Sequence, residues 1–259
     1  MTFQHKKIQQ SMNILGIIPA RYASTRFPGK PLVDIKGKTM IRRVFENCKE
    51  SINDVIVATD NSLIEKEVNQ FGGSVIITSE NHKSGTDRCA EALEKYEKIS
   101  GKTFDIVINI QGDEPFIHKE HLTKLIACFN DSETEIATLI SKTESNADIF
   151  NPNKPKVIID NRNYAIYFSR SPIPYLRGIK KEDWHLHHTF YQHLGIYAYR
   201  NKILKKITKL PVSGLEIAES LEQNRWLENG FKIKTDITLK KNISVDTPED
   251  LEQLIKMFF

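Results

Sequence analysis

Three cations follow the first apolar run of the chain, with no neighbouring carboxylate to balance them. The stretch PARYASTRFPGKPL, residues 19–32, carries Arg21, Arg26 and Lys30 among small and turn-forming residues. An arginine binds phosphate oxygens through two parallel hydrogen bonds, and a lysine adds a point charge. Because a charge-assisted hydrogen bond contributes about 1.5–3 kcal/mol, three such side chains could hold a triphosphate. The loop predicts an anion site, with a solvated basic loop as the alternative.

The glycines of this region do not form either of two common phosphate-binding motifs. Gly16 and the Gly29-Lys30 pair are separated by twelve residues, not the four of a Walker A loop, and a proline follows the lysine. Nor does the loop carry the GxGxxG of a dinucleotide-binding fold. Gly29 can still bring backbone amides close to an anion.

Two aspartates could complete a metal site opposite this loop. Asp113, in QGDEP, follows the strongly apolar run 104–110, and Asp246, in SVDTPEDL, precedes the expected helix N-cap Thr247. Capping accounts for Thr247 and the acids after it, but not for Asp246. Mg²⁺ binds one or two carboxylates and completes its octahedron with phosphates and waters. An ordinary turn at Asp113 and a helix lead-in at Asp246 remain the alternatives.

A third motif, HKSGTDRCAEAL at residues 82–93, places Ser84, Gly85 and Arg88 at a helix start. A helix N-terminus can bind an anion. Capping explains the serine but not Arg88, which is a cation at the unfavourable end of the helix dipole. We therefore expect Arg88 to contact a ligand.

Further polar side chains have ordinary structural explanations. His193 and Tyr197 would more often be satisfied core residues, and Glu222 and Gln223 would more often lie on a solvated helix face. A group of three histidines lacks metal-ligand spacing and stays unassigned: His185, His187 and His188.

The composition is that of an ordinary globular protein. The 259 residues are 39% hydrophobic and 27% charged, and the net charge of +4 is too small and too dispersed to indicate nucleic-acid binding. Cys48, Cys89 and Cys128 form no CxxC pair, so we expect buried free thiols in a reducing compartment. The short apolar run after residues 1–13 is too brief for a signal-peptide core or a membrane span, which predicts a polar extension and a cytoplasmic protein without membrane contact.

Strands and helices alternate in the first half, which predicts an α/β fold: a mostly parallel nucleotide-binding sheet flanked by helices. Proline-broken and aromatic segments at about 136–200 predict an inserted antiparallel elaboration within a single domain, residues 14–259. The expected strands are 14–18, 54–59, 74–78, 104–110, 136–141, 156–160, 164–169 and 232–236, and the expected helices are 39–50, 62–71, 86–98, 201–208, 215–228 and one from 247.

In the order of its motifs the chain resembles the 3-deoxy-manno-octulosonate cytidylyltransferase (CMP-KDO synthetase) family over residues 14–257. The motifs that carry this resemblance are IIPARYASTRFPGKPLVDI, VIVATD, HKSGTDRCAE, QGDEP, NPN, YFSRSPIP, HLGIYAYR, LEQNRWLENG and VDTPEDLE. CMP-sialic acid synthetases share the arrangement but differ in the opening loop. The resemblance implies transfer of CMP from CTP to the acid sugar KDO with Mg²⁺, for lipopolysaccharide biosynthesis, by a homodimer.

The resemblance also implies roles for individual residues. Of these, Arg21, Lys30, Asp113 and Asp246 would act in catalysis. In full, it implies triphosphate contacts at Arg21, Ser24, Arg26 and Lys30, nucleoside contacts at Ser84, Gly85, Arg88 and Gln111, magnesium ligands at Asp113 and Asp246, and acceptor contacts at Gln111, Arg170, His193, Tyr197, Glu222 and Gln223. The chain departs from the family pattern around residues 213–220, on the side of the acceptor contacts.

Other functions remain open at this point. The acceptor could be another acid sugar, 8-amino-KDO or sialic acid, or the protein could be a non-catalytic nucleotide-binding regulator. A glycosyltransferase would be expected to carry an Asp-x-Asp pair, whereas the residues around Asp113 read Gly-Asp-Glu.

Overall fold

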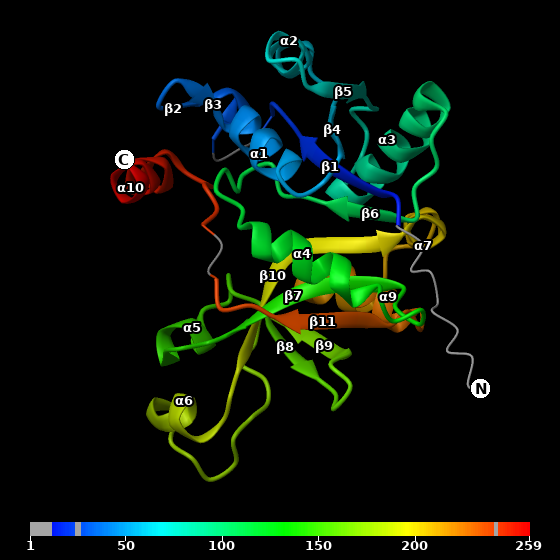
Figure 1. Cartoon of the computed structure of the whole chain (residues 1–259). Coiled ribbons are helices and arrows are strands. Elements are labelled where there is room, and N and C mark those ends of the chain that lie inside the picture. Colours follow the sequence, from blue (N-terminus) through cyan, green and yellow to red (C-terminus); the bar gives the residue numbers. More distant parts are fainter. Residues whose placement is uncertain (1–11, 24–26, 241–242) are drawn as a thin grey trace, which may run out of the picture.

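The computed structural model describes residues 12–23, 27–240 and 243–259, and within these ranges nine strands form one sheet (Figure 1). Its strands are β1 (Ile14–Ala20), β4 (Asp54–Thr59), β5 (Ser74–Ile77), β6 (Ile106–Asn109), β7 (Ile136–Lys142), β8 (Lys156–Ile159), β9 (Ala165–Ser169), β10 (Tyr191–Arg200) and β11 (Ile233–Ile237). The strand order is β11-β7-β10-β6-β1-β4-β5, with β8 paired to β10 and to β9. Two short strands, β2 (Asp34–Ile35) and β3 (Lys38–Thr39), form a separate hairpin.

The predicted mostly parallel sheet is confirmed. β1 runs parallel to β4 and β6, β5 continues the parallel set, and β11 is parallel to β7. The one central exception is β10, which lies antiparallel between β6 and β7. The segment predicted as an antiparallel elaboration therefore supplies two central strands, β7 and β10, as well as the β8–β9 pair.

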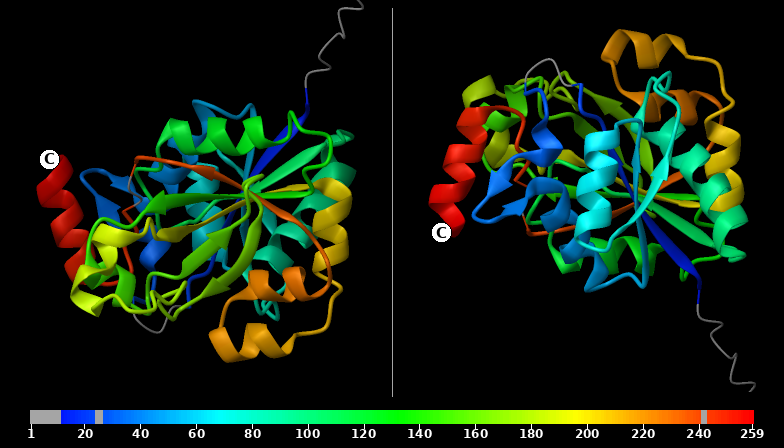
Figure 2. Two further views of the ribbon diagram at one scale, coloured as in Figure 1. Left: turned by 90° about the horizontal axis from the view of Figure 1, so that it is seen from below. Right: turned by 90° about the horizontal axis from the view of Figure 1, so that it is seen from above.

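Helices cover both faces of the sheet (Figure 2). Side chains of the caps Thr39, Asn61, Ser84 and Thr247 accept hydrogen bonds from first-turn amides, which is why these helices begin where they do. The helices are α1 (Met40–Lys49), α2 (Ser62–Gln70), α3 (Gly85–Ser100), α4 (Lys119–Cys128), α5 (Asn146–Phe150), α6 (Trp184–His187), α7 (Asn201–Ile207), α8 (Gly214–Glu219), α9 (Glu222–Glu228) and α10 (Pro248–Phe258), with 3₁₀ turns η1 (Lys30–Leu32) and η2 (Lys181–Asp183).

Two expectations about helices need correction. The single helix expected at 215–228 is two helices, because Ser220 adopts a left-handed conformation (φ 49°) that ends α8 before α9 begins. Helix α4 was not among the expected helices, and its last residue, Cys128, is only half-buried, so the expectation of three buried thiols is wrong for this cysteine. Cys48 and Cys89 are buried as expected.

Alternation along the strands sorts the apolar side chains into two cores. One face packs against α3, α7 and α9, and the other against α1, α2 and α4. In β6, Val107 faces the first core while Ile106 and Ile108 face the second, so the strand is buried on both sides as its continuous apolar sequence predicted. No helix among the described residues is long and apolar enough to cross a membrane.

Candidate active site

The loop after β1 returns on itself at Gly29. The Gly29 amide donates to the Tyr22 carbonyl at 2.9 Å, and Gly29 adopts φ +72° with its Cα against the Tyr22 ring, where a side chain would be strained. Pro31 is buried in the turn η1, which begins with Lys30. The backbone around Lys30 is thus fixed. Two further predicted site residues, Ser24 and Arg26, lie outside the described residues.

Asp113 follows β6 and is brought close to the end of β1 by Gly112. A Cβ at Gly112 would lie 3.0 Å from the Pro19 carbonyl oxygen, so the two loops can approach this closely only with glycine there. The Ile110 amide donates to the Ile17 carbonyl at 2.9 Å and extends the strand pairing up to this loop. Asp113 therefore emerges at the same edge of the sheet as the basic loop, as predicted.

Asp246 reaches the same edge from the far end of the chain. The Val245 amide donates to the Asp113 carbonyl at 2.9 Å, which joins the two aspartate-bearing segments directly. Thr247 and Asp250 form a capping box at the start of α10, and the Asp246 amide donates to the Asp250 carboxylate at 3.0 Å. The capping prediction and the separate position of Asp246 are both found.

A small apolar cluster holds these segments together. Ile35 and Met40 from the region after the basic loop pack with Val245 and with Leu254 of α10, and Phe116 joins from the Asp113 loop. The Phe116 and Phe258 rings stack with centroids 4.1 Å apart. Figure 1 shows α10 beside β2, β3 and α1. The two carboxylates are therefore placed by packing as well as by the backbone.

The two carboxylates converge on Lys30. Its Nζ lies 2.8 Å from Asp113 Oδ2 and 3.3 Å from Asp246 Oδ1. Beside this trio is a cavity of about 400 Å³ between the loops that follow β1 and β6 and the start of α3. Its lining includes Arg21, Lys30, Gly85, Arg88, Gln111 and Asp113. Six of the predicted site residues thus share one cavity, beyond the carboxyl ends of the strands.

Arg21 and Arg88 line the cavity, and each bonds to a segment outside its lining. The Arg21 guanidinium donates to the His82 carbonyl and ties the basic loop to the HKSGTD loop. Arg88 is fully buried, pairs with the Asp60 carboxylate and donates to Thr78 Oγ1 at 2.5 Å. The misfit of Arg88 with the helix dipole is therefore resolved by Asp60. Asp60 follows β4 and was not predicted, although the reasoning that found Asp113 after β6 applies to it equally.

Glu222 joins the cavity to α9. Its carboxylate accepts from Ser84 Oγ at 3.1 Å, from Thr86 Oγ1 at 2.7 Å and from the Arg225 guanidinium at 2.8 Å. Burial raises the pKa of Glu222, while the bonds from Thr86 and Arg225 act in the opposite direction. Glu222 is thus not on a solvated helix face but against the first turn of α3.

The next residues predicted to contact the acceptor are Gln111, Tyr197 and Gln223. A bulge in β10 between Leu194 and Tyr197 reorients the strand, and Gln111 Nε2 donates to the Gly195 carbonyl there at 2.5 Å. Among the described residues, the buried Tyr197 hydroxyl and Gln223 Nε2 have no hydrogen-bond partner. Buried polar atoms of this kind are expected to meet a ligand or water.

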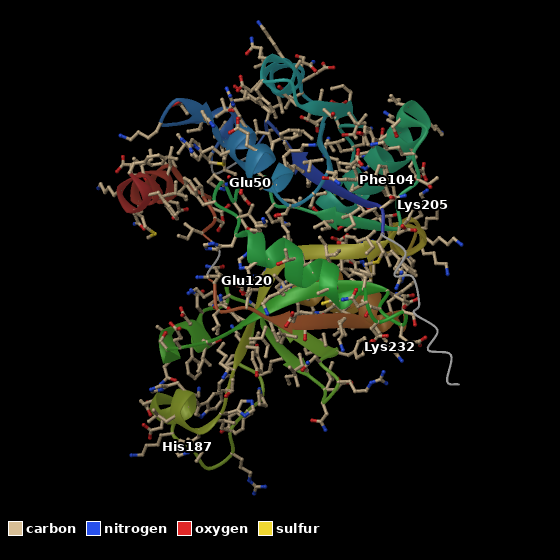
Figure 3. All side chains as sticks on the ribbon, in the orientation of Figure 1. Glu50, Phe104, Glu120, His187, Lys205 and Lys232 are labelled. Atoms are coloured by element: carbon tan, nitrogen blue, oxygen red, sulfur yellow. The ribbon has the colours of Figure 1, made fainter. Side chains whose placement is uncertain are left out.

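His193 and Arg170 are held more fully. The His193 ring lies 5.1 Å from the Tyr197 ring and bonds Thr138 Oγ1 at 3.0 Å; desolvation lowers its pKa to about 3. The Arg170 guanidinium donates to three carbonyls, those of Pro152, Glu219 and Ser220, so it fastens β9 to the end of α8. His187 lies on the lobe that carries α6, away from the main sheet (Figure 3).

Comparisons with known proteins agree on one group. Residues 15–237 match the family model described as cytidylyltransferase. The chain is 56% identical over 248 residues to the 3-deoxy-manno-octulosonate cytidylyltransferase of Parabacteroides distasonis, covering 94% of this chain and 97% of that protein. It is 54% identical over 244 residues to the protein of the same name from Bacteroides thetaiotaomicron, covering 93% and 96%.

Comparison with solved structures also points to cytidylyltransferases. A CMP:2-keto-3-deoxy-manno-octonic acid synthetase complexed with CTP superimposes with a TM-score of 0.86 at 40% identity, covering 95% of this chain and 98% of that one. A Leptospira borgpetersenii cytidylyltransferase, at 21% identity and a TM-score of 0.60, shares the fold; it covers 96% of this chain and 89% of its own.

The stacking of Phe258 on Phe116 predicts that the end of α10 helps to hold the segment that carries Asp246. We expect Phe258→Ala to loosen α10 and to raise the hydrogen-exchange rate of the Val245 amide at least threefold, because that amide reports on the bond to Asp113. Met257→Ala, at an exposed position on the same helix, is the control and should leave the rate unchanged. Equal rates in both variants would show that the stack does not position the aspartates.

The depressed pKa of His193 predicts acid sensitivity. The unfolded chain binds a proton at His193 near its ordinary pKa of 6.5, whereas the folded protein does so only near 3. The contribution to stability is therefore complete above pH 6.5 and is lost as pH falls towards 3, by at most about 1.4 kcal/mol per pH unit. In urea unfolding at pH 7, 6 and 5, His193→Gln should flatten this decline, and the exposed control His185→Gln should not.

Proposed function

The chain belongs to the 3-deoxy-manno-octulosonate cytidylyltransferase family, and from this membership we infer that the cavity beside Lys30, Asp113 and Asp246 is its active site. The enzyme is a nucleotidyltransferase that transfers CMP from CTP to KDO and releases pyrophosphate, a reaction of lipopolysaccharide biosynthesis. The observation that carries the site assignment is the convergence of two distant aspartates on one cation at the rim of that cavity.

We propose that CTP binds with its triphosphate along the loop after β1. Arg21 and Lys30 line the cavity and would bind phosphate oxygens. Gly85, at the start of α3, leaves room for a ligand near the backbone, and Ser84 and Arg88 flank it on the nucleoside side. Gln111 sits between the nucleotide cavity and the β10 bulge, where it can meet both substrates. Ser24 and Arg26 belong to the same proposed triphosphate set.

We propose Mg²⁺ as the cofactor, held by Asp113 and Asp246. Their carboxylates are close enough to share one ammonium, and both are partly exposed. No cluster of three histidine, cysteine or acidic side chains that could hold a metal occurs in the described ranges. A pair of carboxylates nevertheless suits Mg²⁺, which takes its remaining ligands from phosphates and water. Bound there, it would offset the negative charge of the phosphates.

In the reaction, the anomeric hydroxyl of KDO attacks the α-phosphorus of CTP. The new O–P bond forms as the bond from that phosphorus to pyrophosphate breaks, and the proton of the hydroxyl is released to water. Such a displacement depends mainly on alignment and charge stabilisation. Arg21 and Lys30 would stabilise the departing pyrophosphate, and the fixed loops around Gly29 and Gly112 would hold both reactants in line.

The acceptor would lie against α9 and β10. Tyr197 and Gln223 offer buried polar atoms without a partner in the described structure, and such atoms suit sugar hydroxyls. Burial raises the pKa of Tyr197 well above 10, so its hydroxyl can donate. His193 and Glu222 would support these contacts. Arg170 would act indirectly, by holding α8 against β9, because its guanidinium already donates hydrogen bonds to three backbone carbonyls.

We further propose a cytoplasmic homodimer that needs no nucleic-acid partner. Strand β9 and the segment that contains α6 expose large apolar side chains that a second copy could cover: Ile166 at 59%, Tyr175 at 73% and Leu186 at 70% exposure. A face of this kind is costly to leave in water.

The choice of acceptor is tested by pyrophosphate release from CTP with KDO, 8-amino-KDO and sialic acid in parallel. We expect the largest kcat/KM with KDO, by at least tenfold. A preference for either other sugar would reassign the acceptor, and no release with any of them would favour a nucleotide-binding regulator.

The metal assignment is tested by removing each charge. We expect Asp113→Asn and Asp246→Asn to lower kcat at least a hundredfold while circular dichroism remains that of the parent, because an amide binds Mg²⁺ far more weakly than a carboxylate. Glu249→Gln, which removes an exposed acid from the first turn of α10, is the matched control. Near-normal turnover of either aspartate variant at saturating Mg²⁺ would refute the assignment.

A further inference from the structure

Lys30 lies where a shared divalent cation would be expected. Its ammonium contacts both carboxylates that we assign to the metal, and its side chain is 14% exposed, against 26% for Asp113 and 37% for Asp246. The lysine is therefore the most buried member of the trio. The pair of carboxylates already has a cation supplied by the chain itself.

We propose that Lys30 is an internal placeholder for the metal: it neutralises Asp113 and Asp246 until the nucleotide arrives, and so makes metal binding conditional on CTP. This inference rests on the metal assignment made above. It concerns the order in which the site takes its ligands.

Charge explains why the metal alone would be excluded. Two carboxylates with one ammonium between them carry a net charge of −1, and a divalent ion entering this space would meet a fixed positive charge at close range. Like charges brought together in a partly buried site repel strongly. The bare protein therefore has little affinity for the ion, although it carries the correct ligands.

The nucleotide removes this conflict. The triphosphate lies along the loop that contains Lys30, so the ammonium gains phosphate oxygens as new partners when CTP binds. The carboxylates are then left to the metal that accompanies the phosphates. The required movement is confined to the flexible lysine side chain, because η1 and Gly29 fix its backbone.

The proposal predicts effects of opposite sign on the two ligands. Removing the ammonium with Lys30→Met should strengthen metal binding to the nucleotide-free protein and weaken CTP binding. A residue that only binds phosphate would change the second affinity and not the first. A residue that only stabilises the fold would strengthen neither.

The experiment titrates Mn²⁺ alone, followed by electron paramagnetic resonance, into the full-length protein without nucleotide. We expect Lys30→Met to bind Mn²⁺ at least tenfold more tightly than the parent, and Lys30→Arg, which keeps the charge, to resemble the parent. Lys102→Met removes another lysine–aspartate pair, the exposed contact to Asp54 at 2.6 Å, and is the control. CTP affinity of each protein is measured separately by calorimetry.

Thermal melting gives a second readout. In chelator, Lys30→Met should melt below the parent, because two carboxylates face each other without a counter-charge, and Mn²⁺ should recover most of the loss. Lys30→Gln replaces the methionine variant if that protein does not fold. Unchanged Mn²⁺ affinity in the neutral variant would overturn the proposal.

The failure of this proposal can be told from failure of the metal assignment. Adding Asp113→Asn to Lys30→Met should abolish the gained Mn²⁺ affinity. If Asp113→Asn in the parent also leaves Mn²⁺ binding with CTP unchanged, the metal assignment itself is wrong. If that binding is lost but Lys30→Met gains nothing, only the placeholder role is wrong.

Discussion

The bond from the Val245 amide to the Asp113 carbonyl is the constraint on which the site depends. It joins the loop after a central strand to the segment before the last helix. Val245 also packs in the apolar cluster with Met40, Phe116 and Leu254, so α10 helps to position Asp246. The bond between Val245 and Asp113 places the segment that carries Asp246 at the edge of the sheet where Lys30 and Asp113 meet.

The site residues that sequence could predict are those whose position follows from topology. Asp113 and the basic loop follow strands of a parallel sheet, and the carboxyl ends of such strands meet at one edge. Arg88 was singled out by its misfit with the helix dipole, but its partner Asp60 was not. Asp246 stood out because capping did not account for it. For Arg88 and Asp246, the rules for helix dipoles and helix capping left one charged residue unexplained, and that residue was the one predicted to bind a ligand.

The parts that sequence did not predict depend on contacts made by the folded chain. β10 is a central antiparallel strand, yet its bulge at Gly195 interrupts the alternation that marks strands, and the bulge is satisfied by Thr138 and Gln111 from neighbouring strands and loops. The break between α8 and α9 depends on a left-handed Ser220, a conformation that serine seldom adopts. Neither feature has a sequence pattern of its own.

The first turn of α3 lies between the two proposed substrate-binding regions and contacts both. Ser84 caps this helix beside the nucleotide cavity, and Ser84 and Thr86 both donate to Glu222 of α9, behind which Gln223 and Tyr197 lie. Since Arg225 donates to the same carboxylate, Glu222 connects α9 directly to the helix whose first turn lines the cavity. Burial raises the pKa of Glu222, whereas the hydrogen bonds from Thr86 and Ser84 and the charge of Arg225 act to lower it. One carboxylate thus connects the proposed acceptor-binding residues to the proposed nucleotide-binding residues.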